Sequence, residues 1–162
     1  MALVRIVTCF VMLALPGAAA AAEWHYFASF RPKPYRILNF IDIASIASRS
    51  DKTLGADWAI YQETDTNPSL NDRWKVHQVS IDCTAGTYAI VSTKFMREDG
   101  TEARISNQAR PVLEPAGPKT PPESLIAIAC KKATIRTLAI GAFSIPQAAG
   151  QLYPQLDRLT TP

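Results

Sequence analysis

Apolar and polar residues alternate along much of the first two thirds of the chain, which is the pattern of half-buried β-strands. The segment 35–43 divides into two faces, one with Ile37, Asn39, Ile41 and Ile43 and the other with Leu38, Phe40 and Asp42. Further strand segments lie at residues 23–30, 57–63, 73–83, 87–96 and 101–106. Short turns at Gly86 and Gly100 join the later ones. The pattern predicts about six strands, the last four as an antiparallel meander.

The segment 73–83 changes phase in its middle. Trp74 and Val76 follow one phase of the alternation, whereas Val79, Ile81 and Cys83 follow the other. A β-bulge near residues 77–78 would restore one buried face.

Residues 120–131 predict a helix. Thr120 is an expected N-cap, Pro121 suits the first helical position, and Glu123 completes a capping box. Apolar residues then recur at helical spacing at Leu125, Ile126, Ala129 and Cys130. This stripe indicates a helix that packs across one face of the sheet.

Two weaker patterns are also present. Asp42 precedes a short stretch, 43–46, in which it is expected to cap one helical turn. Beyond residue 132 the pattern weakens, with strand character at 134–140 and a short helix at 146–153 that Pro154 would stop. We therefore expect 133–162 to be a C-terminal extension, weakly structured or carrying a short helix.

The first 22 residues have the composition of a secretory signal peptide. A positively charged start precedes an apolar run at 6–15, and small residues at 18–22 predict cleavage before Glu23. The run is too short for a membrane span, which needs about 20 residues. Cys9 lies inside the run rather than at its end, so no lipid anchor is expected. The chain is expected to be exported to the periplasm, the cell surface or the medium.

Removal of the signal peptide leaves Cys83 and Cys130 as the cysteines of the mature chain. Two thiols in an oxidising compartment are expected to pair. The link would close a loop of 48 residues and stabilise the fold by roughly 4 kcal/mol on the chain-entropy model. The alternative, a redox-active pair, lacks the C-x-x-C spacing.

The composition after cleavage suits one domain without a nucleic-acid partner. Of 162 residues, 140 remain, and with Arg5 gone 16 basic residues face 14 acidic ones, a net charge of +2. This balance does not indicate binding to nucleic acid or to a membrane surface. No second apolar segment is long enough for a transmembrane helix.

The sequence carries no catalytic or cofactor motif. His25 and His77 are 52 residues apart, and neither is part of a motif with the spacing of metal ligands, such as H-E-x-x-H. No phosphate-binding glycine loop or nucleophile elbow occurs. We therefore expect no cofactor, no metal and no catalysis, and a small hydrolase is the least favoured reading.

One stretch, residues 26–36, has the composition of a binding surface. It interleaves aromatic and basic residues, which often anchor interfaces. The candidate binding residues are Phe30, Arg31, Lys33, Tyr35 and Arg36. The alternative is a core strand with alternate buried aromatics followed by a solvated basic loop, and the need of any sheet for such residues favours it.

Taken together, these signals resemble the bacterial surface-adhesin protein E-like domain. The similar segments are the Trp-x-Tyr start at Trp24–Tyr26, then 40–43 with 45–46, 79–83 with 88–93, 112–115, and a helix ending at Cys130. The resemblance covers residues 24–131 and implies an antiparallel sheet, a helix packed on it, and a disulfide between them. The chain departs from the family in lacking a lipobox and in its residues after 132.

The resulting expectation is an α+β fold over residues 23–132. A single antiparallel sheet would carry one C-terminal helix on a face, stapled by the disulfide. The resemblance implies a non-catalytic secreted or periplasmic cell-envelope binding protein, with a host protein or an envelope component as partner. The alternative is a structural or accessory periplasmic protein without a role in host adhesion.

Overall fold

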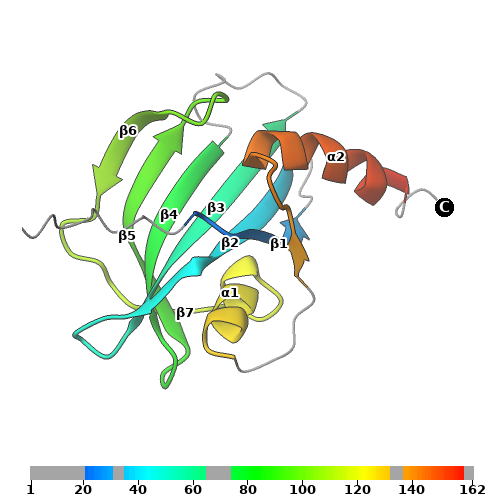
Figure 1. The fold of residues 1–162 in the computed structure, drawn as a ribbon. Coiled ribbons are helices and arrows are strands. Elements are labelled where there is room, and N and C mark those ends of the chain that lie inside the picture. Colours follow the sequence, from blue (N-terminus) through cyan, green and yellow to red (C-terminus); the bar gives the residue numbers. More distant parts are fainter. Residues whose placement is uncertain (1–20, 31–34, 65–73, 132–136, 159–162) are drawn as a thin grey trace, which may run out of the picture.

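One antiparallel sheet of eight strands forms the framework of the computed structural model, which describes residues 21–30, 35–64, 74–131 and 137–158 (Figure 1). The strands are β1 (Trp24–Phe30), β2 (Tyr35–Ser48), β3 (Leu54–Thr64), β4 (Trp74–Asp82), β5 (Thr87–Met96), β6 (Glu102–Asn107), β7 (Glu114–Pro115) and β8 (Leu138–Ala139). Their order is β6-β5-β4-β3-β2-β1-β8, with β7 paired to β5. The predicted α+β class and antiparallel sheet are confirmed. The count is eight rather than six because β7 and β8, of two residues each, are too short to show alternation.

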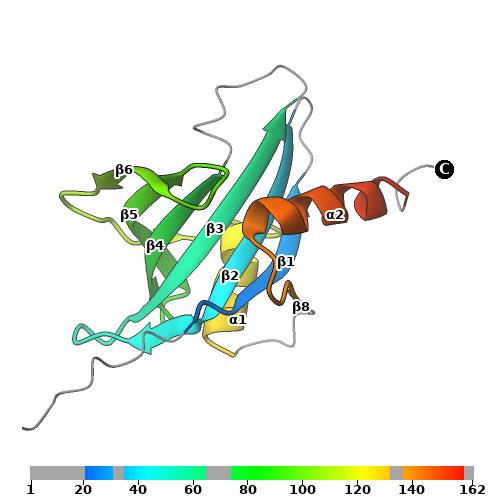
Figure 2. The same ribbon diagram turned by 45° about the horizontal axis from the view of Figure 1, so that its top comes forward.

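Two helices, α1 (Pro121–Ala129) and α2 (Ile145–Arg158), lie on opposite faces of the sheet (Figure 2). The α1-side core is formed by Phe27, Ile41, Ala56, Trp58, Val79, Ile81, Leu125, Ile126 and Ala129. The α2-side core is formed by Leu38, Phe40, Ala59, Trp74, Val76, Ile140, Ile145, Ala148, Ala149, Leu152 and Tyr153. The expectation of one helix on one face is therefore corrected, since the sheet has a buried cluster on each side.

This two-sided burial explains the change of phase in β4. The pairing of β4 with β3 is continuous from Leu54 to Tyr61, so the side chains of β4 simply alternate. Trp74 and Val76 belong to the α2-side core, whereas Val79 belongs to the α1-side core. An irregularity does lie beside Gln78, but the extra residue is in β5. The bulge predicted within β4 is therefore wrong: the irregularity lies at the expected level, but the bulged strand is β5. No single buried face of β4 has to be restored, because β4 is buried on both faces.

The helical turn expected at residues 43–46 is absent, and β2 continues to Ser48. The contact that motivated it is present, since Ala44 donates its backbone N–H to Asp42 Oδ1 at 3.1 Å. Ser45 Oγ also donates to the Asp42 carbonyl at 2.7 Å. These bonds lie where the β2–β3 ladder is interrupted, between Asp42 and Ala47. The carboxylate therefore stabilises an irregularity within a strand rather than a helix start.

Helix α1 buries the predicted stripe, Leu125, Ile126 and Ala129. Its capping box is not formed. Thr120 Oγ1 donates to the Gly117 carbonyl at 2.6 Å, and Glu123 Oε2 accepts the N–H of Lys119 at 2.6 Å. The Glu123 carboxylate thus bonds one residue earlier than the box requires.

The predicted disulfide is confirmed between Cys83, just after β4, and Cys130, the C-cap of α1. The two Cα atoms are 5.6 Å apart, within the usual span of about 4.4–6.8 Å. The bond therefore fixes the end of α1 to the sheet.

Helix α2 runs through Pro154 to Arg158, so the predicted stop at Pro154 is wrong. Proline cannot donate to the carbonyl four residues earlier, but Gly150 and Pro154 are both exposed, so water can reach that carbonyl. The residue directly before Pro154 is held on the sheet, because Tyr153 donates its hydroxyl to the Arg36 carbonyl at 3.0 Å. Of the strand expected at 134–140, residues 138–139 form β8, and 134–136 lie outside the described residues. Across the described part of the chain, neither helix has the length and apolarity that a membrane crossing needs.

Candidate binding site

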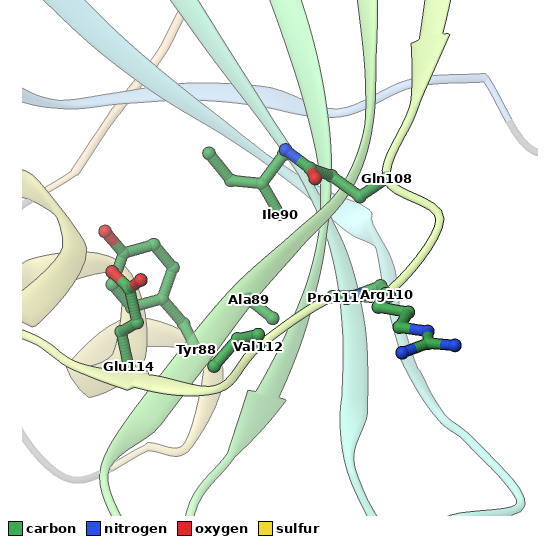
Figure 3. A pocket seen from close by; sticks show the side chains of 8 residues that line it. All are labelled: Tyr88, Ala89, Ile90, Gln108, Arg110, Pro111, Val112 and Glu114. Atoms are coloured by element: carbon green, nitrogen blue, oxygen red, sulfur yellow. The ribbon is translucent and has the colours of Figure 1, made fainter.

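The chain that follows β6 bows away from the edge of β5 and leaves a pocket behind it. The β5–β6 ladder ends at the Ser92–Asn107 pair, and the β5–β7 ladder begins at Tyr88–Glu114. Three residues of β5, 89–91, thus lie opposite the six residues 108–113. We call 108–113 the crossing segment. Its excess length, with Pro111 in its middle, opens a pocket of about 230 Å³ (Figure 3).

Tyr88 and Glu114 form one end of this pocket, and Arg110 lies at the opposite end (Figure 3). Burial, and next the charge of Glu114, raise the pKa of the Tyr88 phenol. The hydroxyl is therefore protonated at neutral pH and available as a donor. Trp58 contacts the Tyr88 ring edge-on, with ring centroids 6.4 Å apart, and so anchors it to the α1-side core. The pocket offers a cation, an anion and a fixed aromatic ring.

A second hollow adjoins the first at Tyr88. It has a volume of about 330 Å³ and is lined by Tyr88, Gly117, Lys119, Thr120, Pro121 and Pro122, at the start of α1. Tyr88 therefore lines both hollows.

A third pocket lies between the crossing segment and the turn that precedes β3. Its volume is about 280 Å³, and its lining residues are Arg49, Asp51, Thr53, Ser80, Ala89, Val91, Pro111 and Leu113. The floor is rigid, because Thr53 Oγ1 lies 2.7 Å from Ser80 Oγ and 2.6 Å from Asp51 Oδ1. Hydrogen bonds from Thr53 lower the pKa of the Asp51 carboxyl, so its charge is kept at neutral pH.

Two large apolar side chains of the crossing segment are exposed to solvent. Val112 is 68% exposed and belongs to the first pocket, and Leu113 is 44% exposed and belongs to the third. Both lie between the charges of Arg110 and Glu114. The combination of adjacent exposed apolar groups with flanking charges and hollows is typical of an interaction surface.

Of the binding residues predicted from sequence, the structure describes the side chain of Arg36. Its guanidinium pairs with Glu63 and lies 4.6 Å from the centre of the Tyr153 ring. Arg31 and Lys33 lie outside the described residues, and so do the side chains of Phe30 and Tyr35. Binding by this loop therefore stays a prediction. Arg36 also packs against the fold through its contacts with Glu63 and Tyr153.

The fold also forms two hydroxyl–imidazole pairs that spacing along the chain does not reveal. His25 Nδ1 lies 3.0 Å from Thr137 Oγ1, and its Nε2 lies 3.2 Å from Glu23 Oε1. His77 Nδ1 lies 2.8 Å from Thr93 Oγ1. Burial, and then the charge of Lys75, lower the pKa of His77 to about 4. Neither imidazole lines the three pockets around the crossing segment.

The described residues contain no group of three or more histidine, cysteine or acidic side chains placed to hold a metal ion. Comparisons of the chain with protein-family models, with curated proteins and with solved structures found no match.

Proposed function

We propose that the protein is a non-catalytic, exported binding protein of the bacterial cell envelope, and that the crossing segment is where it holds a polypeptide partner. The observation that supports this is the exposure of Val112 and Leu113 on a segment with a pocket on either side. Apolar side chains of this size gain free energy when a partner covers them. Because Val112 and Leu113 are exposed, their burial contributes little to the stability of the isolated fold.

The chemistry of the site suits a polypeptide better than a small charged ligand. The pockets of about 230 and 280 Å³ are each large enough for a side chain of a partner. The Arg110 guanidinium can donate two hydrogen bonds to one carboxylate of a partner, and the Tyr88 hydroxyl can donate to a carbonyl. Pro111 restricts the free segment, which lowers the entropy lost on binding.

Two partner classes follow from the expected export. A host protein would be met on the cell surface, whereas an envelope component would be met in the periplasm. The second reading corresponds to an accessory envelope protein with the same binding surface. Protease accessibility of the protein on intact cells separates them, because a periplasmic protein is shielded by the outer membrane.

The test is the double variant Val112→Asp, Leu113→Asp, assayed by pull-down from two probes: a basement-membrane protein extract and the solubilised envelope of the producing bacterium. We expect capture to fall at least about tenfold, since two buried charges are costly. Ile105→Asp is the matched control, because Ile105 is also a large exposed apolar residue but lies on β6 outside the pockets. Unchanged capture by a folded double variant contradicts the proposed site.

A second double variant tests the alternative binding site predicted from the sequence, the loop at residues 30–36. Arg31→Ala with Lys33→Ala removes its charges and leaves Arg36, whose contacts with Glu63 and Tyr153 support the fold. If the Arg31→Ala, Lys33→Ala double variant loses capture and the crossing-segment variant does not, the binding site lies in the loop at residues 30–36.

A further inference from the structure

Glu23, the residue just before β1, is held at both its backbone groups. Its backbone nitrogen donates to Asp42 Oδ1 at 2.7 Å, and its carbonyl accepts the N–H of Ile43 at 3.0 Å. Asp42 is only 6% exposed. The two preceding residues, Ala21 and Ala22, are exposed. The chain therefore leaves the folded body immediately before a nitrogen that lies on a buried carboxylate.

A second carboxylate lies beside the first. Asp42 and Asp57 are directly opposite each other in the β2–β3 ladder, on the same face of the sheet. Side chains in such a pair have Cβ atoms about 4.5–5.5 Å apart, and like charges there are destabilising. Burial raises the pKa of Asp57, the charge of Lys94 opposes this, and the charge of Asp42 adds to it. Two carboxylates and one lysine leave this part of the sheet one positive charge short.

We propose that the leader is removed between Ala22 and Glu23, and that the α-ammonium group created there pairs with Asp42 and supplies the missing positive charge. This inference rests on the export part of the proposed function. Ala20 and Ala22 are the small residues that a signal-peptide-cleaving peptidase requires before the cut.

The hydrolysis consumes one water. The C–N bond between Ala22 and Glu23 breaks, the hydroxyl of water goes to the Ala22 carbonyl carbon, and the released leader ends in a carboxylate. The nitrogen of Glu23 becomes a primary amine, which is protonated at neutral pH because its ordinary pKa is about 7.7–8.0. The existing hydrogen bond to the Asp42 carboxylate then joins two ionised groups, so a direct ion pair is added to it.

The position of the cut matters. Cleavage one residue earlier would leave a neutral amide on Asp42 and place the charge on Ala22, one Cα spacing of about 3.8 Å along an exposed segment. Cleavage before Glu23 alone puts the ammonium on the atom that already contacts the carboxylate.

The first measurement is the mass of the protein recovered after export of the full chain, which should start at Glu23. The second is an NMR titration of its α-amino group, whose pKa should lie at least about one unit above the ordinary range. The charged groups around this amine are Asp42 on β2, which it contacts, Asp57 opposite Asp42 on β3, and the side chains of Glu23 and His25. Lys94 on β5 acts on Asp57. A raised pKa means that the pairing stabilises the fold at neutral pH, and that this stabilisation is lost as pH rises through the raised value.

Asp42→Asn keeps an acceptor and removes the charge, so it should return the amine to its ordinary pKa. Asp82→Asn is the matched control, because Asp82 Oδ1 also accepts two backbone N–H groups, from Thr84 and Ala85, in a turn away from the amine. It should leave the titration unchanged. The wild-type titration decides the matter even if a variant does not fold.

The outcomes separate the two proposals. A recovered protein that keeps its leader overturns both the inference and the export part of the proposed function. A cut elsewhere, or an α-amino pKa within about 7.7–8.0 in the folded wild type, overturns the inference alone.

Discussion

Replacing Ile145 with alanine tests whether α2 is an integral cover of the sheet. Ile145 is the first residue of α2 and is 1% exposed in the α2-side core. The substitution removes three buried carbon groups, which at about 0.8 kcal/mol each is roughly 2.4 kcal/mol. A cavity term adds to this, so we expect a loss of about 3 kcal/mol, within the usual range of about 2–5. Alanine is the best helix former, so the loss would report packing rather than helix propensity.

The assay is equilibrium urea unfolding, which gives both the free energy of unfolding and the m-value. Leu125→Ala, in α1 on the opposite face and fully buried, should lose about 2–5 kcal/mol. Leu138→Ala is the control, because Leu138 is 53% exposed, and its change should lie within about 0.5 kcal/mol. An effect of Ile145→Ala as small as that of the control would refute the packing of α2 on the sheet.

Two further predictions concern the disulfide and the buried histidine. The double variant Cys83→Ser, Cys130→Ser opens a loop with a sequence separation of 47 and should lose about 4 kcal/mol in urea unfolding; a loss below about 1 kcal/mol would contradict the entropic account. Because burial holds the pKa of His77 at about 4, the unfolded chain takes up a proton below pH 6.5 that the folded chain does not. Stability should therefore fall between pH 6.5 and 4, by up to about 3 kcal/mol at roughly 1.4 kcal/mol per pKa unit, and this part of the pH dependence should be missing in His77→Gln.

The strands and α1 follow from the sequence because their signals are local. Alternation identifies both ends of β5 and the start of β2, although it misses the last five residues of β2. The apolar stripe identifies the buried face of α1. The cysteine count after the expected removal of the leader predicts the disulfide between Cys83 and Cys130. The strands and the helix need only the order of residues within one element. The disulfide needs only the cysteine count and an oxidising compartment.

The second buried face could not be derived in the same way. A phase change such as that between Val76 and Val79 fits a bulge in a one-sided sheet as well as a continuous strand buried on both sides. The pattern within β4 does not distinguish them. The decision depends on α2, whose own signal is weakened by Gly150 and Pro154, and both of these are exposed.

The candidate binding site at the crossing segment could not be predicted from the sequence for a different physical reason. The pockets arise because six residues of the crossing segment lie opposite three of β5, and this count exists only once the β5–β6 and β5–β7 registers are known. The signal in the sequence was an apolar pair, Val112 and Leu113, between Pro111 and Pro115 and outside every predicted strand and helix. Aromatic and basic composition drew attention to residues 30–36 instead.

Residues that follow α1 also hold the start of β1 in place. Strand β1 lies between β2 and β8, so its first residues have a neighbour on either side. Ile140 donates its N–H to the Trp24 carbonyl at 3.1 Å, while Asp42 on the other side accepts the N–H of Glu23. Trp24 in turn packs against the α2-side core, to which Ile140 belongs. The start of β1 is thus held by residues more than a hundred positions later in the chain. Contacts with β2 and with the residues after α1 already hold the backbone of Glu23 and Trp24 in position. A new α-ammonium group at Glu23 could therefore pair with the Asp42 carboxylate with little further ordering of the backbone.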